Sequence, residues 1–99
     1  METVLHLPES EPPCTLSEVL AALSEQNLTP RHEQKNWGDW IHFEDYRTVI
    51  SIESMRGLTR SATLEADESD APDPTPAILR AFGNLGWYGL DEDGEYPLG

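Results

Sequence analysis

The chain has 99 residues, 37% of them hydrophobic, and carries 19 Asp and Glu against 6 Lys and Arg, which gives a formal net charge of -13. This length indicates a single domain over residues 1–99, and the charge excludes direct binding to nucleic acid or to anionic membranes while it attracts basic partners. No segment reaches the roughly 18 apolar residues of a membrane span, and the N-terminus lacks a basic start, so we expect a cytoplasmic protein.

The N-terminal segment has a short apolar run from Val4 to Leu7, which ends at Pro8. This run favours a weak edge strand, and part of a flexible arm is the alternative. Three prolines in residues 8–14 exclude a regular strand ladder, so this stretch is expected to be a flexible linker. Cys14 is the only cysteine, which excludes an internal disulfide. We interpret it as a small packing residue.

Residues 15–27 carry the clearest helix signal in the chain. Thr15 and Glu18 have the spacing of a capping box, and Asn27 suits the left-handed position at a helix C-terminus. Four apolar side chains recur at the spacing of one buried stripe: Leu16, Val19, Leu20 and Leu23.

Residues 31–66 have the pattern of an antiparallel meander, with strands expected at 31–35, 39–44, 48–53 and 58–66. Alternation places Ile41, Phe43, Ile50 and Ile52 on the core face. The same rule puts Leu58, Arg60, Ala62, Leu64 and Ala66 on the core face of the last strand. The opposite face is expected to carry Trp40, His42, Val49, Ser51, Thr59, Ser61 and Thr63.

Two acidic segments flank a second predicted helix. Residues 67–75 form an acidic, proline-containing loop, and the tail at 91–99 is also acidic, so both are expected to be flexible. Thr75 is the expected N-cap of the helix, with Pro76 at its first position and an end near Leu85.

These elements predict an α+β fold, in which an antiparallel β-meander sheet of three to five strands has two helices packed on one face. The other sheet face is only partly apolar, so we expect a second subunit or another partner to cover part of it.

Complete catalytic and metal-binding motifs are missing from the sequence. It has no Gly-x-Ser-x-Gly elbow and no phosphate-binding glycine loop, and His6, His32 and His42 lie far apart. We therefore predict no catalytic, cofactor-binding or metal-binding residues, no cofactor, and a protein that is not an enzyme. A small enzyme that uses His42 remains an alternative.

Aromatic residues near predicted turns are the main candidates for partner binding, because Trp and Tyr dominate the energetics of many interfaces. Arg60 joins them because it stands on an otherwise apolar strand face and can pair there with a carboxylate. The competing interpretation is that Trp40 and Trp87 close the ends of a small core. The predicted partner-binding residues are Trp37, Trp40, His42, Tyr46, Arg60, Trp87 and Tyr88.

The layout resembles the class I type III secretion chaperones and related small acidic α+β proteins. The shared features are the stripe from Leu16 to Leu23, the meander that follows it, the helix from Pro76 to Leu85 and the low isoelectric point. The resemblance implies a cytoplasmic protein that usually dimerises and holds other proteins without catalysis.

The sequence therefore predicts a non-catalytic, acidic protein-binding module of chaperone or adaptor type, and the oligomeric state is left open with a homodimer as one alternative. Its partner is expected to be another protein, and a basic protein is one alternative. The alternative function is an acidic inhibitor or immunity-type protein, whose carboxylates mimic nucleic acid phosphates or block a basic site.

Overall fold

The computed structural model describes residues 2–98. Its elements, in chain order, are β1 (Glu2–His6), β2 (Cys14–Thr15), α1 (Leu16–Glu25), β3 (Pro30–Lys35), β4 (Gly38–Phe43), β5 (Tyr46–Met55), β6 (Leu58–Glu65), α2 (Thr75–Asn84), β7 (Tyr88–Asp91) and β8 (Gly94–Pro97).

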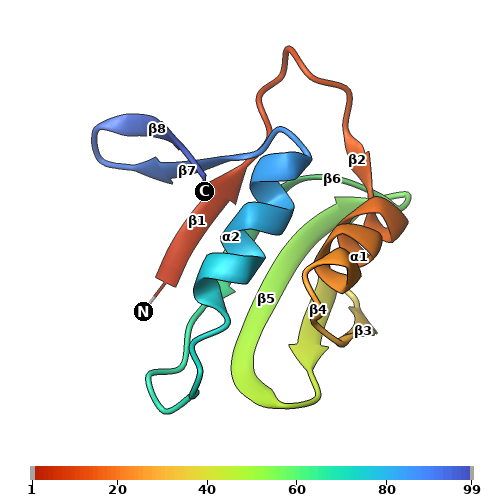
Figure 1. The fold of residues 1–99 in the computed structure, drawn as a ribbon. Coiled ribbons are helices and arrows are strands. Elements are labelled where there is room, and N and C mark those ends of the chain that lie inside the picture. Colours follow the sequence, from red (N-terminus) through yellow and green to blue (C-terminus); the bar gives the residue numbers. More distant parts are fainter. Residues whose placement is uncertain (1, 99) are drawn as a thin grey trace.

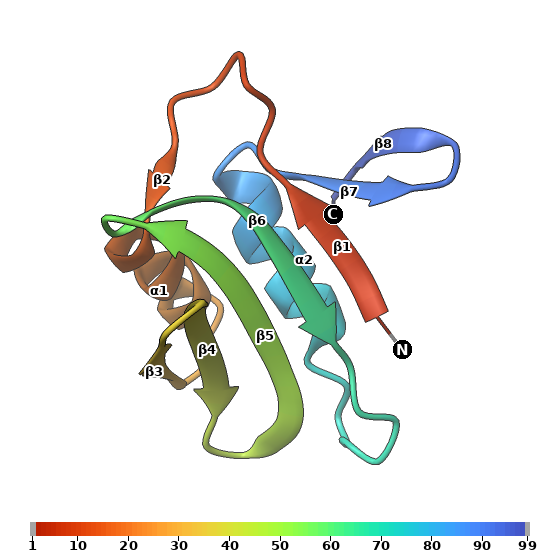
Figure 2. The ribbon, with the colours of Figure 1, turned by 180° about the vertical axis from the view of Figure 1, so that it is seen from behind.

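All strands belong to one antiparallel sheet with the order β3-β4-β5-β6-β1-β7-β8, and β2 also pairs with β6. Both helices lie on the same side of this sheet (Figure 1), and the view from behind shows the strands in front of them (Figure 2). We call the covered side the helix face and the other side the open face. The predicted sheet of three to five strands was wrong, because the described sheet has eight.

The additional strands come from both ends of the chain. β1 is an internal strand rather than an edge, because it pairs with β6 on one side and with β7 on the other. β2 pairs with the beginning of β6, so β1 and β2 are two parts of one interrupted strand. The intervening residues leave the sheet as a loop, and Arg60 Nη1 donates a hydrogen bond of 2.7 Å to the Pro8 carbonyl at its start.

The first helix forms as its sequence predicts. Glu18 N donates to Thr15 Oγ1 over 3.1 Å, and Thr15 N donates to Glu18 Oε1 over 3.2 Å, which confirms the capping box. Asn27 has a φ of 63° in the left-handed region, as expected after a helix C-terminus. Val19 and Leu23 are buried, and Leu16 and Leu20 pack against the core from its margin.

The predicted cap of the second helix was wrong. α2 begins at Thr75, so Thr75 is inside the helix and Pro74 is its N-cap. The Thr75 amide donates instead to Asp73 Oδ1 over 3.0 Å. The Asp73 carboxylate therefore accepts from an amide at the helix start. The sequence analysis assigned this capping role to the Thr75 hydroxyl.

A β-bulge changes the side-chain alternation of β6. Glu53 pairs with Ser61, but the next residue of β5, Ser54, pairs with Thr59, so Arg60 is an extra residue on its strand. Consequently Thr59 is 2% exposed and donates to the Glu53 carbonyl, while Leu58 is exposed. The prediction that Leu58 and Arg60 face the core and Thr59 faces away was wrong for this reason.

The core lies between the helix face and the two helices. Ile41, Ile50, Ile52 and Leu64 line the sheet side of it, as alternation predicts, and Phe82 of α2 covers them from the other side. The remaining members of the buried cluster are Leu5, Leu7, Cys14, Val19, Ala22, Leu23, Leu28, Phe43, Ala62, Ile78, Ala81 and Trp87.

All three segments predicted to be flexible have defined contacts, and those of residues 8–14 are at Pro8 and Cys14. Asp70 accepts hydrogen bonds from the Arg47 amide, the Thr48 amide and the Thr48 hydroxyl, which tie the loop at 67–75 to the start of β5. Burial alone would raise the pKa of Asp70, but these hydrogen bonds outweigh it and lower the pKa. β8 lies within the tail at 91–99. The mobility of the three segments stays a prediction.

Candidate functional site

Exposed apolar side chains gather on the open face. The register aligns Glu33, Trp40, Ser51, Thr63, Val4, Leu90 and Glu95 in one row from β3 to β8. Because paired residues of neighbouring strands share a sheet face, this row also assigns their i+2 neighbours to the open face. The large hydrophobic side chains exposed among residues 2–98 are Val4, Trp37, Met55, Leu58, Tyr88 and Leu90.

At the β3–β4 end, three rings follow one another. Trp37 in the turn contacts Trp40 edge-to-face at 5.6 Å between ring centroids, and Trp40 stacks on His42 at 6.0 Å. His42 Nε2 lies 3.3 Å from Glu33 Oε1, and Lys35 Nζ lies at the same distance from that oxygen. The hydrogen bonds from His42 and Lys35 lower the pKa of Glu33. The rings are therefore bordered by a carboxylate that stays ionised.

The other end of the open face is formed by β1 and β7. Val4 pairs with Leu90, and His6 pairs with Tyr88, so two apolar side chains and one phenol stand next to each other. His6 Nε2 lies 3.5 Å from Glu95 Oε1 on β8. This end combines exposed apolar area with a polar border, as protein interfaces commonly do.

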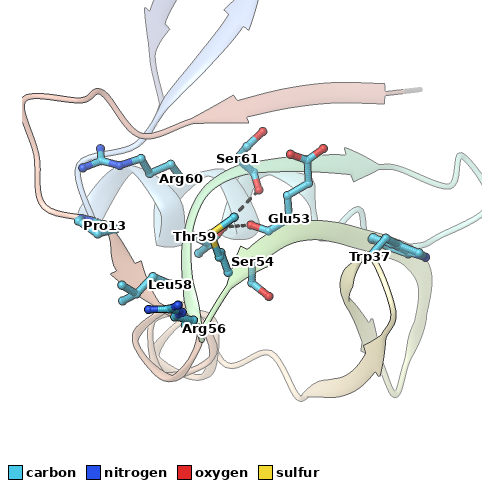
Figure 3. Close-up of a pocket in the computed structure, with 10 residues that line it drawn as sticks. Pro13, Trp37, Glu53, Ser54, Arg56, Leu58, Thr59, Arg60 and Ser61 are labelled. Carbon is cyan, nitrogen blue, oxygen red and sulfur yellow. Dashed lines mark hydrogen bonds between the residues drawn. The ribbon is translucent and has the colours of Figure 1, made fainter.

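A cavity of about 680 Å³ lies at the β5–β6 hairpin. Figure 3 shows Trp37 on one side of it and Leu58 with Arg56 on the other. The residues that line it are Pro13, Trp37, Glu53, Ser54, Met55, Arg56, Leu58, Thr59, Arg60 and Ser61. Met55 is 77% exposed and Trp37 is 51% exposed, which leaves much of their apolar surface in contact with solvent. We call this feature the hairpin pocket.

The structure brings together three of the predicted partner-binding residues, Trp37, Trp40 and His42, and places Tyr88 at the opposite end of the same face. Arg60 lines the hairpin pocket, but its Nη1 atom bonds the Pro8 carbonyl and not a carboxylate.

Tyr46 and Trp87 belong to the core side. Tyr46 pairs with the buried Phe43 and packs against the core cluster. Trp87 is 1% exposed, contacts Phe82 edge-to-face at 5.0 Å and donates from Nε1 to Cys14 Sγ over 3.3 Å. In this structure Trp87 has no surface to offer a partner, so it fits the competing interpretation of a core residue.

Sequence reasoning missed Val4, Met55, Leu58 and Leu90 as exposed apolar residues. For Val4 the signal was present, because it alternates with the buried Leu5. Met55 and Leu58 flank Arg56-Gly57, and a two-residue turn places such neighbours side by side on one face. Leu90 was missed because the sequence analysis did not predict β7, which pairs with β1 on one side and with β8 in a hairpin on the other.

A polar cluster lies on the helix face. Asp39 is 4% exposed, and its carboxylate is hydrogen-bonded by His32 Nε2 through one oxygen and by Ser54 Oγ through the other. Burial would raise the pKa of Asp39, but these two hydrogen bonds and the nearby imidazole lower it. The Ser54 hydroxyl donates to Asp39 and not to the His32 imidazole, whereas a hydroxyl nucleophile would be activated by a hydrogen bond to such a base. The cluster joins β3, β4 and β5.

Within residues 2–98, no three His, Cys, Asp or Glu side chains gather in a way that could hold a metal ion. In the same part of the chain, no helix has both the length and the apolar character needed to cross a membrane.

Comparison of the chain with protein-family models, with curated proteins and with solved structures found no match.

Proposed function

We propose that this protein is a non-catalytic protein-binding module and that its open face contacts the partner. The observation that carries the proposal is the distribution of exposed apolar side chains. The large hydrophobic side chains that are exposed among residues 2–98 lie on the open face or line the hairpin pocket. Exposed apolar patches bordered by polar groups mark protein interaction sites, and each end of the open face has this composition.

The chemistry of this face favours a protein ligand. Trp37, Trp40 and Tyr88 offer large apolar surfaces with a polar group, which contribute strongly when a partner removes water from them. Between the two ends of the face, Ser51 and Thr63 offer small hydroxyl groups that suit close approach of another backbone. The face therefore has two apolar ends and a polar centre.

The resemblance to type III secretion chaperones is consistent with such a module, and we carry it forward as part of the proposal together with a cytoplasmic location. A homodimer is one form the proposal allows, because a second copy would offer the same self-complementary arrangement of apolar ends.

The test compares three substitutions that each introduce one positive charge. Leu90→Lys and Trp37→Lys alter opposite ends of the open face, and Ala21→Lys lies on the exposed side of α1 as a matched control. Each variant and the wild type are used to capture partners from the native host's lysate at about 0.15 M salt. Loss of the captured protein with either open-face variant but not with Ala21→Lys is expected. Equal capture by all variants would overturn the proposal.

The alternative is an acidic inhibitor that blocks a basic protein. The net charge of -13 and the exposed Asp91, Glu92 and Asp93 at the β7–β8 turn favour it. Complexes held by such charges weaken steeply with salt, whereas apolar contacts do not. A partner that is released between about 0.15 M and about 1 M salt, and is lost equally from all three lysine variants, would support this alternative.

A further inference from the structure

The turn of the hairpin pocket contains an unusual residue for its backbone conformation. Arg56 has a φ of 56° and Gly57 a φ of 78°, as in the two-residue turns that join twisted antiparallel strands. Glycine and asparagine adopt the left-handed conformation readily, but a long side chain with a Cβ does so at a cost. Asn27, the other non-glycine residue of residues 2–98 with positive φ, follows this preference, and Arg56 does not.

The charge of Arg56 is also uncompensated. Lys35 pairs with Glu33, Arg60 bonds the Pro8 carbonyl, and Arg80 donates to Gln26 over 3.2 Å. In contrast, the Arg56 guanidinium, like that of Arg31, has no hydrogen bond or ion pair with any residue in the described range 2–98, although acids outnumber bases threefold in the sequence. Glu53, the acidic residue of the lining, points away from Arg56 (Figure 3).

Beside this cation lie the most exposed large hydrophobic side chains among residues 2–98. Met55 and Leu58 are paired across the hairpin on either side of the turn, and Trp37 closes the opposite wall of the cavity. A flexible thioether, an aliphatic group and an indole ring can adapt to an apolar side chain that enters from solvent. The pocket thus has apolar side chains on its two sides, polar residues between them, and the unpaired Arg56 guanidinium at its rim.

We propose that the hairpin pocket binds a segment of the partner protein in which an apolar side chain is followed by a carboxylate, with the apolar group between Met55, Leu58 and Trp37 and the carboxylate on Arg56. This inference rests on the proposed function and specifies the partner's contact chemistry. It reverses the charge preference expected from the whole chain, because a protein of net charge -13 attracts cations at long range. At physiological salt, charges farther than about 8 Å are largely screened, so the local guanidinium decides the preference at the pocket.

The test uses three capped peptides as probes: acetyl-Ser-Phe-Glu-Ser-amide, its Gln analogue and its Lys analogue. Binding to the full chain is followed by nitrogen–proton NMR at about 0.15 M salt, with the amides of Met55 and Leu58 and the indole of Trp37 as reporters. We expect the Glu peptide to bind about threefold more tightly than the Gln peptide, as for an exposed ion pair, and the Lys peptide to bind most weakly.

Arg56→Asn is the decisive variant, because asparagine suits the turn and keeps the fold intact. Arg31→Gln, on β3, removes the same charge away from the pocket and is the matched control. The preference for Glu over Gln should disappear in Arg56→Asn and persist in Arg31→Gln. Arg56→Asn should also melt at or above the wild-type temperature, because the left-handed conformation is then less costly.

Three results would overturn the inference: equal or tighter binding of the Lys peptide, a Glu preference that survives in Arg56→Asn, or spectral shifts that avoid the three reporter residues. These outcomes differ from failure of the proposed function. If Leu90→Lys abolishes capture of the partner while the peptides show no charge preference, the open face binds a protein but the hairpin pocket does not select a carboxylate.

Discussion

The two faces of the sheet are built from the same strands and differ in what covers them. On β5, Ile50 and Ile52 lie under the helices, while the intervening Ser51 and the neighbouring Val49 lie on the open face. The helix face obtains its stability from close packing against α1 and α2, whereas the open face has only the contacts between adjacent side chains. Alternate residues of one strand therefore have different roles: those on the helix face stabilise the fold, and those on the open face form the surface. Substitutions at adjacent positions can test this difference.

The largest difference in the free energy of unfolding is expected between substitutions at two neighbouring residues of β5. Ile50→Ala removes a fully buried side chain and should lower the free energy of unfolding by about 2–5 kcal/mol. Val49→Ala, one residue earlier on the open face, should lower it by less than about 1 kcal/mol. Urea denaturation measures both. Equal losses would show that the two faces do not differ in packing.

The buried carboxylate of the helix face should give the next largest effect. Asp39→Asn weakens the hydrogen bonds with His32 and Ser54 and should cost about 1–3 kcal/mol at neutral pH. Glu92→Gln, at the exposed β7–β8 turn, is the control for the loss of one negative charge.

The pH dependence of this effect has a defined sign. The pKa of Asp39 is lower in the folded protein than its ordinary value of 3.8, so the unfolded state takes up the proton first as pH falls. The stability difference between wild type and Asp39→Asn should be full above about pH 4 and should shrink as the pH falls through the lowered pKa. Denaturation curves at a series of pH values measure it, and a difference that grows in acid would contradict the assignment.

At the bulge in β6 the side-chain alternation changes, so a substitution there tests whether the two sheet faces still differ. Arg60→Gln removes the hydrogen bond to the Pro8 carbonyl and should cost about 0.5–1.5 kcal/mol. Amide hydrogen exchange should become faster at Leu7, whose N–H donates to the Arg60 carbonyl over 2.9 Å. Arg31→Gln removes an exposed cation at the sheet edge and serves as the control. Unchanged exchange at Leu7 would show that the guanidinium does not hold the loop.

The smallest effect on stability belongs to the open face. Leu90→Lys places a charge on an exposed position of β7 and should change the free energy of unfolding by no more than about 0.5 kcal/mol in thermal melting. The same variant is expected to lose the partner, so the two measurements together separate binding from folding. A large loss of stability would show that the open face is part of the core.

The sequence predicted features that depend on neighbouring residues and missed those that depend on distant ones. The capping box of Thr15 and Glu18 lies within four residues, and the alternation of Ile50 with Ile52 lies within one strand, so both could be read directly. β2 is a strand only because Cys14 and Thr15 meet Thr59 and Leu58, and no local propensity encodes that pairing. The size of the sheet was underestimated for this reason at β2, and also because the sequence analysis assigned residues 91–99 to a flexible tail, whereas Leu90 and Glu95 pair in the local hairpin of β7 and β8.

The candidate site shows the same division. Trp37, Trp40 and His42 were identified because their residue types suit binding, and their proximity follows from one turn and one strand. Trp87 has the same residue type but a buried position, which depends on Phe82 and Cys14. The exposed position of Leu58 depends on the bulge at Arg60, which shifts the alternation of β6 and leaves no mark in the residue pattern.

The position of β1 between β6 and β7 has a consequence for the order in which the chain can fold. Among the described residues, β7 pairs with β1 and with β8, so the C-terminal hairpin joins the sheet only through the N-terminal strand. β1 itself pairs with β6, which places Glu2 opposite Glu65. Closing such long loops is slow compared with forming the local hairpins of β3 to β6. The meander can therefore assemble first as a nucleus, and the two ends of the chain then add to it in a fixed succession, β1 before the hairpin of β7 and β8.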